Sequence, residues 1–162
     1  MSAPGTPFDP TAPDAPRPGG QGLSRSDWHA RRAAILDTNV FVAAGFNPSS
    51  RSARIVDAVR AGRLRMVWND ATRREIERVL SRIPPLRGED VSELFRDEDR
   101  YTGETHPEQF DYVPDPADRP FAALADATGW PLVTADEHLL AGRARARAPI
   151  LTSREFVRQY PL

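Results

Sequence analysis

The sequence contains no cysteine and no lysine among its 162 residues, and each absence excludes classes of site. Without cysteine there is no thiol nucleophile, no cysteine-based zinc site and no sign of an oxidising compartment. All 22 basic residues are arginine, which excludes a Walker A phosphate loop and a Schiff-base enzyme. Response-regulator receivers and haloacid-dehalogenase-like phosphatases are excluded as well, because those families use a lysine in the site.

Long apolar runs are also lacking. No run approaches the roughly 20 residues that span a bilayer, so we expect no membrane association. The N-terminus does not combine a basic segment with an apolar stretch, so we expect no signal peptide and a cytoplasmic location. The net charge of −1 provides no overall field for nucleic acid, and any such binding must come from a local basic face.

The length is that of one domain with a single core. Residues 1–30 are rich in proline and glycine with almost no apolar content, which predicts a disordered tail. A folded domain is expected over residues 31–162.

Short apolar runs alternate with helical patterns through this domain. The runs predict strands at 33–37, 65–68, 110–113, 130–134 and 150–151. Apolar spacing and capping residues predict helices at 40–44, 53–61, 70–81, 118–128, 136–141 and 153–160, the last capped by Ser153. This order indicates an α/β fold of three α/β/α layers, with a parallel sheet of about five strands. Residues 86–110 are charged and irregular, with a weak helical pattern at 91–95.

Four carboxylates occupy positions that such a sheet would present at one edge. Asp37 and Asp136 each close an apolar run, Asp118 opens a predicted helix, and Glu75 lies off the apolar stripe of another. Ligands of open α/β sheets bind at the carboxyl ends of the strands, so these side chains are expected to meet. Crowded carboxylates raise one another's pKa unless a divalent cation neutralises them. The pattern therefore predicts a metal site suited to attack on a phosphate.

Each carboxylate also has a purely structural interpretation. Asp37 could form a turn after its strand, while Asp118 and Asp136 could cap the helices that they precede. Glu75 could be solvated, and the neighbouring Glu77 competes with it, although the helical phase favours Glu75.

Further residues are secondary candidates. Asp115 is expected near the outside of the site, and Asp126 is expected to face solvent. Candidate phosphate contacts are the arginines at 51, 54, 60, 63, 65, 143, 145 and 147, for which a solvated surface is the alternative.

The order and spacing of four motifs resemble those of a known family. The motifs are Ile-Leu-Asp-Thr-Asn-Val at 35–40, Glu-Ile-Glu-Arg-Val-Leu at 75–80, Asp-Arg-Pro-Phe-Ala-Ala-Leu-Ala at 118–125 and Val-Thr-Ala-Asp-Glu-His-Leu-Leu at 133–140. Over about residues 33–158 the chain resembles a PIN-domain endoribonuclease. The VapC-type toxins of toxin-antitoxin pairs have this fold. Within the family, the chain most resembles the toxin-antitoxin PIN subgroup. It departs from the pattern of that subgroup at Arg119-Pro120, where asparagine often follows the aspartate, and in the acidic insert at 88–108.

The resemblance implies an activity and a set of roles. Asp37, Glu75, Asp118 and Asp136 would bind one or two Mg²⁺ or Mn²⁺ ions, with Thr38, Asn39 and Thr134 as polar supports. The protein would be a metal-dependent endoribonuclease that hydrolyses RNA, a toxin held in check by a small antitoxin, and a homodimer. The alternatives are a non-catalytic PIN-type module that binds RNA or protein, and a nuclease for DNA or flap structures.

Overall fold

The computed structural model describes residues 32–86 and 91–162, so the predicted tail at 1–30 lies outside the described residues. Four parallel strands form one sheet in the order β2-β1-β3-β4. They are β1 (Ala33–Leu36), β2 (Arg65–Met66), β3 (Leu132–Val133) and β4 (Ile150–Leu151).

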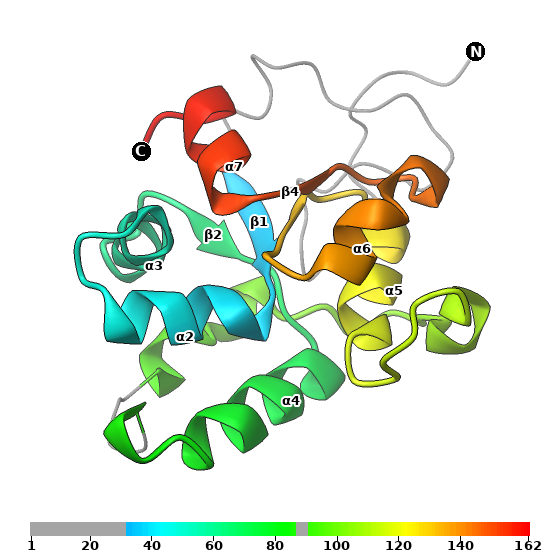
Figure 1. Ribbon diagram of the computed structural model, residues 1–162, viewed down its shortest axis with the longest axis horizontal. Helices are drawn as coiled ribbons and strands as arrows, with labels where there is room; N and C mark the ends of the chain where they lie inside the picture. Colours follow the sequence, from blue (N-terminus) through cyan, green and yellow to red (C-terminus); the bar gives the residue numbers. More distant parts are fainter. Residues whose placement is uncertain (1–31, 87–90) are drawn as a thin grey trace.

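Six α-helices and five short 3₁₀ helices surround this sheet within the described residues (Figure 1). The α-helices are α2 (Thr38–Phe46), α3 (Arg51–Arg60), α4 (Asp70–Ser81), α5 (Arg119–Thr128), α6 (Glu137–Ala141) and α7 (Ser153–Gln159). The 3₁₀ helices are η1 (Pro84–Leu86), η2 (Ser92–Leu94), η3 (Asp97–Asp99), η4 (Pro107–Phe110) and η5 (Arg143–Arg145). None of the helices in the described part has the length and apolar content needed to cross a membrane.

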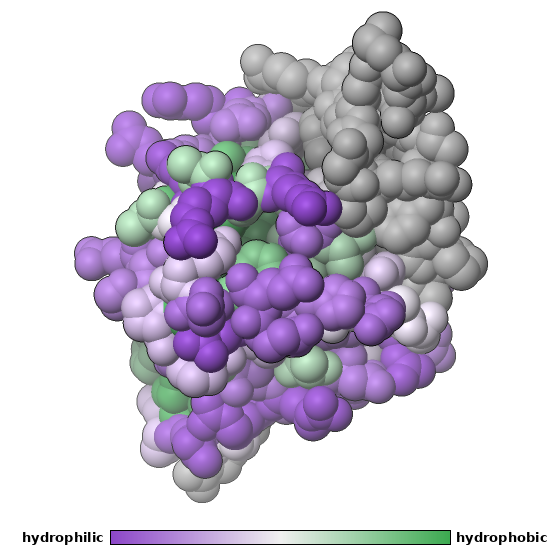
Figure 2. All heavy atoms as spheres, turned by 90° about the vertical axis from the view of Figure 1, so that its right-hand side faces the viewer, coloured by the Kyte–Doolittle hydropathy of each residue, from purple (hydrophilic) through white to green (hydrophobic). Residues whose placement is uncertain are grey.

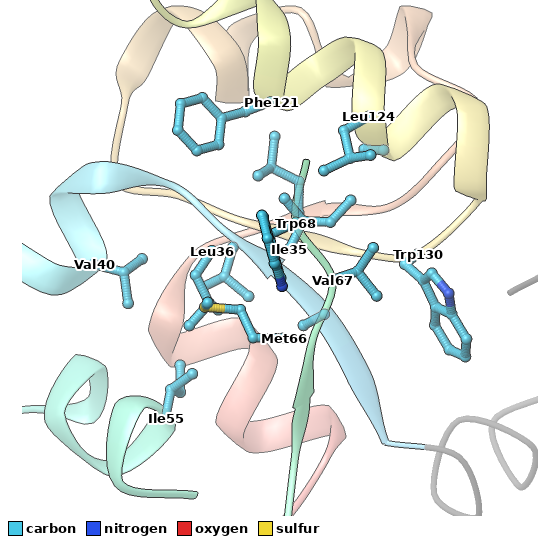
Figure 3. Packing of buried hydrophobic residues seen from close by; sticks show 14 of the residues in the cluster. Ile35, Leu36, Val40, Ile55, Met66, Val67, Trp68, Phe121, Leu124 and Trp130 are labelled. Atoms are coloured by element: carbon cyan, nitrogen blue, oxygen red, sulfur yellow. The ribbon is translucent and has the colours of Figure 1, made fainter. Parts of the chain in front are cut away.

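The core lies between the sheet and the helices on its two faces. Figure 3 shows Phe121 and Leu124 of α5 on one side of the sheet and Ile55 of α3 on the other. All three side chains are fully buried, and every residue of β1 is buried as well. A strand covered on both faces needs apolar residues at successive positions, which explains the continuous Ala-Ala-Ile-Leu run. The predicted α/β/α layering is therefore confirmed.

The register of the central strands determines which residues meet at the edge of the sheet. Leu36 of β1 is paired with Val133 of β3. The next backbone amide, that of Asp37, donates to Val133 O at 2.9 Å. Asp37 and Thr134 therefore leave adjacent strands at the same edge.

Local capping sequences set the ends of the helices. α4 begins with a capping box between Asn69 and Thr72, and α5 ends at Gly129, whose φ of 77° is readily adopted by glycine. The predicted cap of α7 is wrong. Thr152 caps this helix, whereas the hydroxyl of Ser153 lies 2.9 Å from that of Ser52 in α3.

The prediction of a strand at 110–113 is also wrong, and the sheet has four strands rather than five. Phe110 ends η4 and is buried together with Val113. These apolar side chains therefore pack in the core, although their segment is not a strand of the sheet. The segment expected to be irregular contributes the additional pairing instead. Arg100 forms a parallel β-bridge with Trp68, and the amide of Tyr101 donates to Trp68 O at 2.7 Å.

Candidate active site

Helices α2, α4, α5 and α6 are arranged around the end of β1 (Figure 1). Three of the predicted site residues occupy the N-cap positions of these helices, namely Asp37 for α2, Asp118 for α5 and Asp136 for α6. The N-terminus of a helix carries partial positive charge, which favours an ionised carboxylate nearby. The fold therefore presents separate acidic residues at one edge of the sheet.

Asp37 is a buried carboxylate fixed by neighbouring donors, with only 2% of its surface exposed. Its Oδ1 accepts from the amide of Thr38 at 2.7 Å, and its Oδ2 accepts from Thr134 Oγ1 at 2.7 Å and Asn39 Nδ2 at 3.2 Å. Burial raises the pKa of Asp37, the bonds from Thr134 and Thr38 oppose that rise, and the charge of Asp136 adds to it.

Thr134 and Asn39 connect the ends of β1 and β3. The hydroxyl of Thr134 donates to Asp37 and accepts from the amide of Asp136 at 2.9 Å. Asn39 Oδ1 accepts from the amide of Ala135 at 3.0 Å. Asn39 and Thr134 thus both contact the carboxylate of Asp37.

Thr38, the third predicted support, has a different environment. Its Oγ1 is buried and has no hydrogen-bond partner within the described part of the chain. A buried hydroxyl without a partner is unusual, because removing it from water costs about 1–3 kcal/mol. The site therefore holds an unused oxygen on the residue next to Asp37.

The pKa of Asp118 is affected by the charges of several other carboxylates. Burial and the charges of Asp37, Asp136, Asp115 and Glu75 raise its pKa to about 7. Its side chain makes no capping hydrogen bond, so the interpretation as a helix cap does not account for this carboxylate. Asp136 is different, because its Oδ1 caps α6 by accepting from the amide of Leu139 at 2.9 Å.

The structure distinguishes Glu75 from Glu77. Glu75 is 17% exposed, forms an ion pair with Arg78 and raises the pKa of Asp118. Glu77 is exposed and pairs with Arg73 at 2.8 Å. Glu75 is therefore the glutamate of this helix whose charge is seen to act on Asp118.

Asp115 lies at the exposed rim, where its Oδ1 accepts from the amide of Ala117 at 2.9 Å. Its charge contributes to the raised pKa of Asp118. Asp126 lies 3.7 Å from Arg147 and is not among the charges that raise the pKa of Asp118. Arg119, adjacent to Asp118, donates from Nε to Val113 O at 2.9 Å.

Sequence reasoning overlooked Arg78. Its guanidinium donates to both oxygens of Glu75, at 2.9 Å from Nε and 2.6 Å from Nη2. Glu75 and, more weakly, Asp115 raise the pKa of Arg78. The spacing of three residues between Glu75 and Arg78 was a usable signal, since residues three apart are neighbours on a helix.

The donor set fits a hard divalent cation. Carboxylate oxygens and a buried hydroxyl are ligands suited to Mg²⁺ or Mn²⁺. Across residues 32–86 and 91–162, however, no three acidic or histidine side chains already meet in a metal-binding arrangement. Glu75 is engaged by Arg78, and Asp136 by the amide of Leu139. A cation that binds there would share these carboxylates with the donors already present.

Comparison with known families adds independent support for the fold. The family model described as PIN domain matches residues 33–138, well over half of the chain, including all four predicted site residues. Searches of curated proteins and of solved structures find no match. PIN domains are in general nuclease modules that typically use divalent metals. With its matching sequence and its parallel sheet between helical layers, the chain belongs to the PIN domain family.

Proposed function

We propose that the protein is an endoribonuclease dependent on Mg²⁺ or Mn²⁺, with Asp37, Glu75, Asp118 and Asp136 as its metal ligands. The observation that carries this proposal is the crowding around Asp118, whose pKa is raised to about 7 by burial and by four other carboxylates. Such a concentration of negative charge is unfavourable until a cation neutralises it.

A bound divalent cation supplies Lewis-acid polarisation of the phosphate and lowers the pKa of a coordinated water. Asp37 provides the most rigid oxygen ligand, because Thr38, Asn39 and Thr134 hold its carboxylate. Asp118 carries a proton part of the time near neutral pH, so it loses that proton when a cation binds.

The proposal of RNA as the substrate rests on the resemblance of the motifs to the VapC-type toxins. Hydrophilic side chains predominate on the face shown in Figure 2, with smaller apolar patches between them. Arg143, Arg145 and Arg147 are exposed in and beside η5, which follows α6. They remain candidates for phosphate contacts, although Arg143 also pairs with Glu155 at 3.1 Å.

Cleavage of a mixed panel of RNA and DNA by the purified protein tests the activity. Reactions with Mg²⁺, Mn²⁺ or EDTA are run for the wild type, Asp37→Asn and Asp118→Asn. Asp126→Asn is the matched control, because Asp126 lies on α5 but is not one of the four proposed metal ligands. We expect metal-dependent cutting of RNA that is lost in the first two variants and retained in the control.

Other results would favour the alternatives. Cutting of DNA or flap structures alone would indicate the DNA nuclease. Absence of cutting together with absence of metal binding would indicate a non-catalytic module.

The biological role follows the same resemblance. We propose a cytoplasmic toxin that forms a homodimer and is neutralised by a small antitoxin. Expression should arrest growth, and Asp37→Asn should relieve the arrest. Equal toxicity of the variant would exclude catalysis as the cause, and light scattering of the purified protein would establish whether it dimerises.

A further inference from the structure

Arg78 is a cation on α4 that pairs with the proposed metal ligand Glu75. It donates to both oxygens of Glu75 on its own helix. The charge of Asp115, in the segment before α5, also raises the pKa of Arg78. A bidentate pair between arginine and a carboxylate is shorter and stronger than a single hydrogen bond between neutral groups. The charge of Glu75 is thus neutralised by a side chain of the same helix.

This ion pair has a consequence for metal binding. Among the described residues, no three candidate ligands meet in a metal-binding arrangement, and Glu75 has both oxygens engaged by the guanidinium. Glu75 is 17% exposed and Arg78 is 44% exposed, so the pair is only partly screened by water. A cation bound to Glu75 would share this carboxylate with the positively charged guanidinium, which weakens its attraction to the cation.

We propose that Arg78 is an internal counter-ion that competes with the divalent cation for Glu75 and thereby lowers the metal affinity of the site. This inference rests on the proposed function, because it assumes that Glu75 is a metal ligand. Partly exposed ion pairs are modest in strength, so the competition changes the affinity by a few fold rather than by orders of magnitude. Arg78 is a positioning residue in this account, acting on the metal only through Glu75.

The same helix provides a matched comparison. Arg73 pairs with Glu77 through Nε at 2.8 Å, and Glu77 is not among the charges that raise the pKa of Asp118. Arg73→Gln and Arg78→Gln remove the same charge from the same helix. Only the second variant releases a proposed ligand.

Calorimetric titration of Mn²⁺ into the metal-free full-length protein tests the inference. We expect Arg78→Gln to bind Mn²⁺ about three- to fivefold more tightly than the wild type, in line with the strength of a partly exposed pair. Arg73→Gln should stay within about twofold of the wild type. Arg78→Lys, which keeps the charge but not the paired donors, should fall between the wild type and Arg78→Gln.

A double-mutant cycle separates competition from a general effect of charge. In the Glu75→Gln background, which has the three remaining carboxylates, Arg78→Gln should alter the Mn²⁺ affinity by less than about twofold. Equal gains in both backgrounds would overturn the inference, as would equal affinities for Arg78→Gln and Arg73→Gln. In either case the wild type would still bind Mn²⁺, and the proposed function would stand. If the wild type binds neither Mn²⁺ nor Mg²⁺, the proposed function and the inference both fail.

Discussion

Thr134 Oγ1 donates to Asp37 Oδ2 at 2.7 Å, joining two residues that are 97 positions apart in the sequence. The contact exists because β1 and β3 are neighbours in the sheet and end at the same level. The same hydroxyl accepts from the amide of Asp136, so one side chain sets the positions of two proposed metal ligands.

Replacement of this hydroxyl should impair the site. In Thr134→Val, Asp37 loses a hydrogen-bond donor and the amide of Asp136 loses its acceptor. We expect RNA cleavage to fall by about 10- to 100-fold, as is typical when a group that orients a metal ligand is removed. Steady-state kinetics of the purified variant measure the change.

Thr128→Val is the matched control for that variant. Thr128 is equally buried, and its hydroxyl donates to Leu124 O within α5 rather than to a carboxylate. Each valine substitution should reduce stability by about 1–3 kcal/mol, but only Thr134→Val should reduce cleavage. Equal activity of the two variants would show that Thr134 does not position the site.

In the absence of metal ions, the protein should become less stable as the pH rises from about 4 to 7. The pKa of Asp118 is raised to about 7 from a usual value of 3.8, so between these values the folded state binds more protons than the unfolded state. Stability then falls with increasing pH, and the raised pKa of Asp37 acts in the same direction. Thermal unfolding in EDTA at several pH values measures the effect.

Asp118→Asn should reduce this pH dependence, because asparagine has no proton to lose. At pH 8 the variant should melt about 2–4 °C higher than the wild type, the shift that about 1 kcal/mol gives in a domain of this size. A pH dependence unchanged in Asp118→Asn would show that another group is responsible.

Glu75 and Glu77 provide a direct comparison of two glutamates on one helix. Glu75→Gln should lower metal-dependent cleavage at least tenfold, since it removes a proposed ligand. Glu77→Gln should stay within about twofold of the wild type, because Glu77 is exposed and pairs with Arg73. The ratio of kcat/KM values is the measurement, and a greater loss in Glu77→Gln would reverse the assignment.

The sequence predicted the parts of the fold that depend on continuous local signals. The buried run of β1 is apolar at every position, and Gly129 marks the end of α5. Asp37, Asp118 and Asp136 were proposed because each lies directly after such a run or at the start of a helix, whereas Glu75 was proposed from its helical phase.

The sequence was not sufficient to predict the parts of the fold that depend on contacts between distant segments. Phe110 and Val113 have the composition of a strand, but they bury their side chains from η4 and the following turn. Arg100 forms an isolated β-bridge with Trp68, beyond the end of β2, within a segment that has no apolar periodicity, and it also forms an ion pair with Asp70 at 2.7 Å. No local pattern encodes such pairings between distant segments.

Titration of Mg²⁺ into the metal-free protein, followed by calorimetry, tests the central claim that the carboxylates of four separate segments form one metal site. The wild type should bind Mg²⁺ at pH 7 with release of protons, since Asp118 is partly protonated there. Asp37→Asn and Asp118→Asn should each bind at least tenfold more weakly, while Asp126→Asn should bind as the wild type does. Wild-type affinity in Asp118→Asn, or no binding by the wild type itself, would contradict the account.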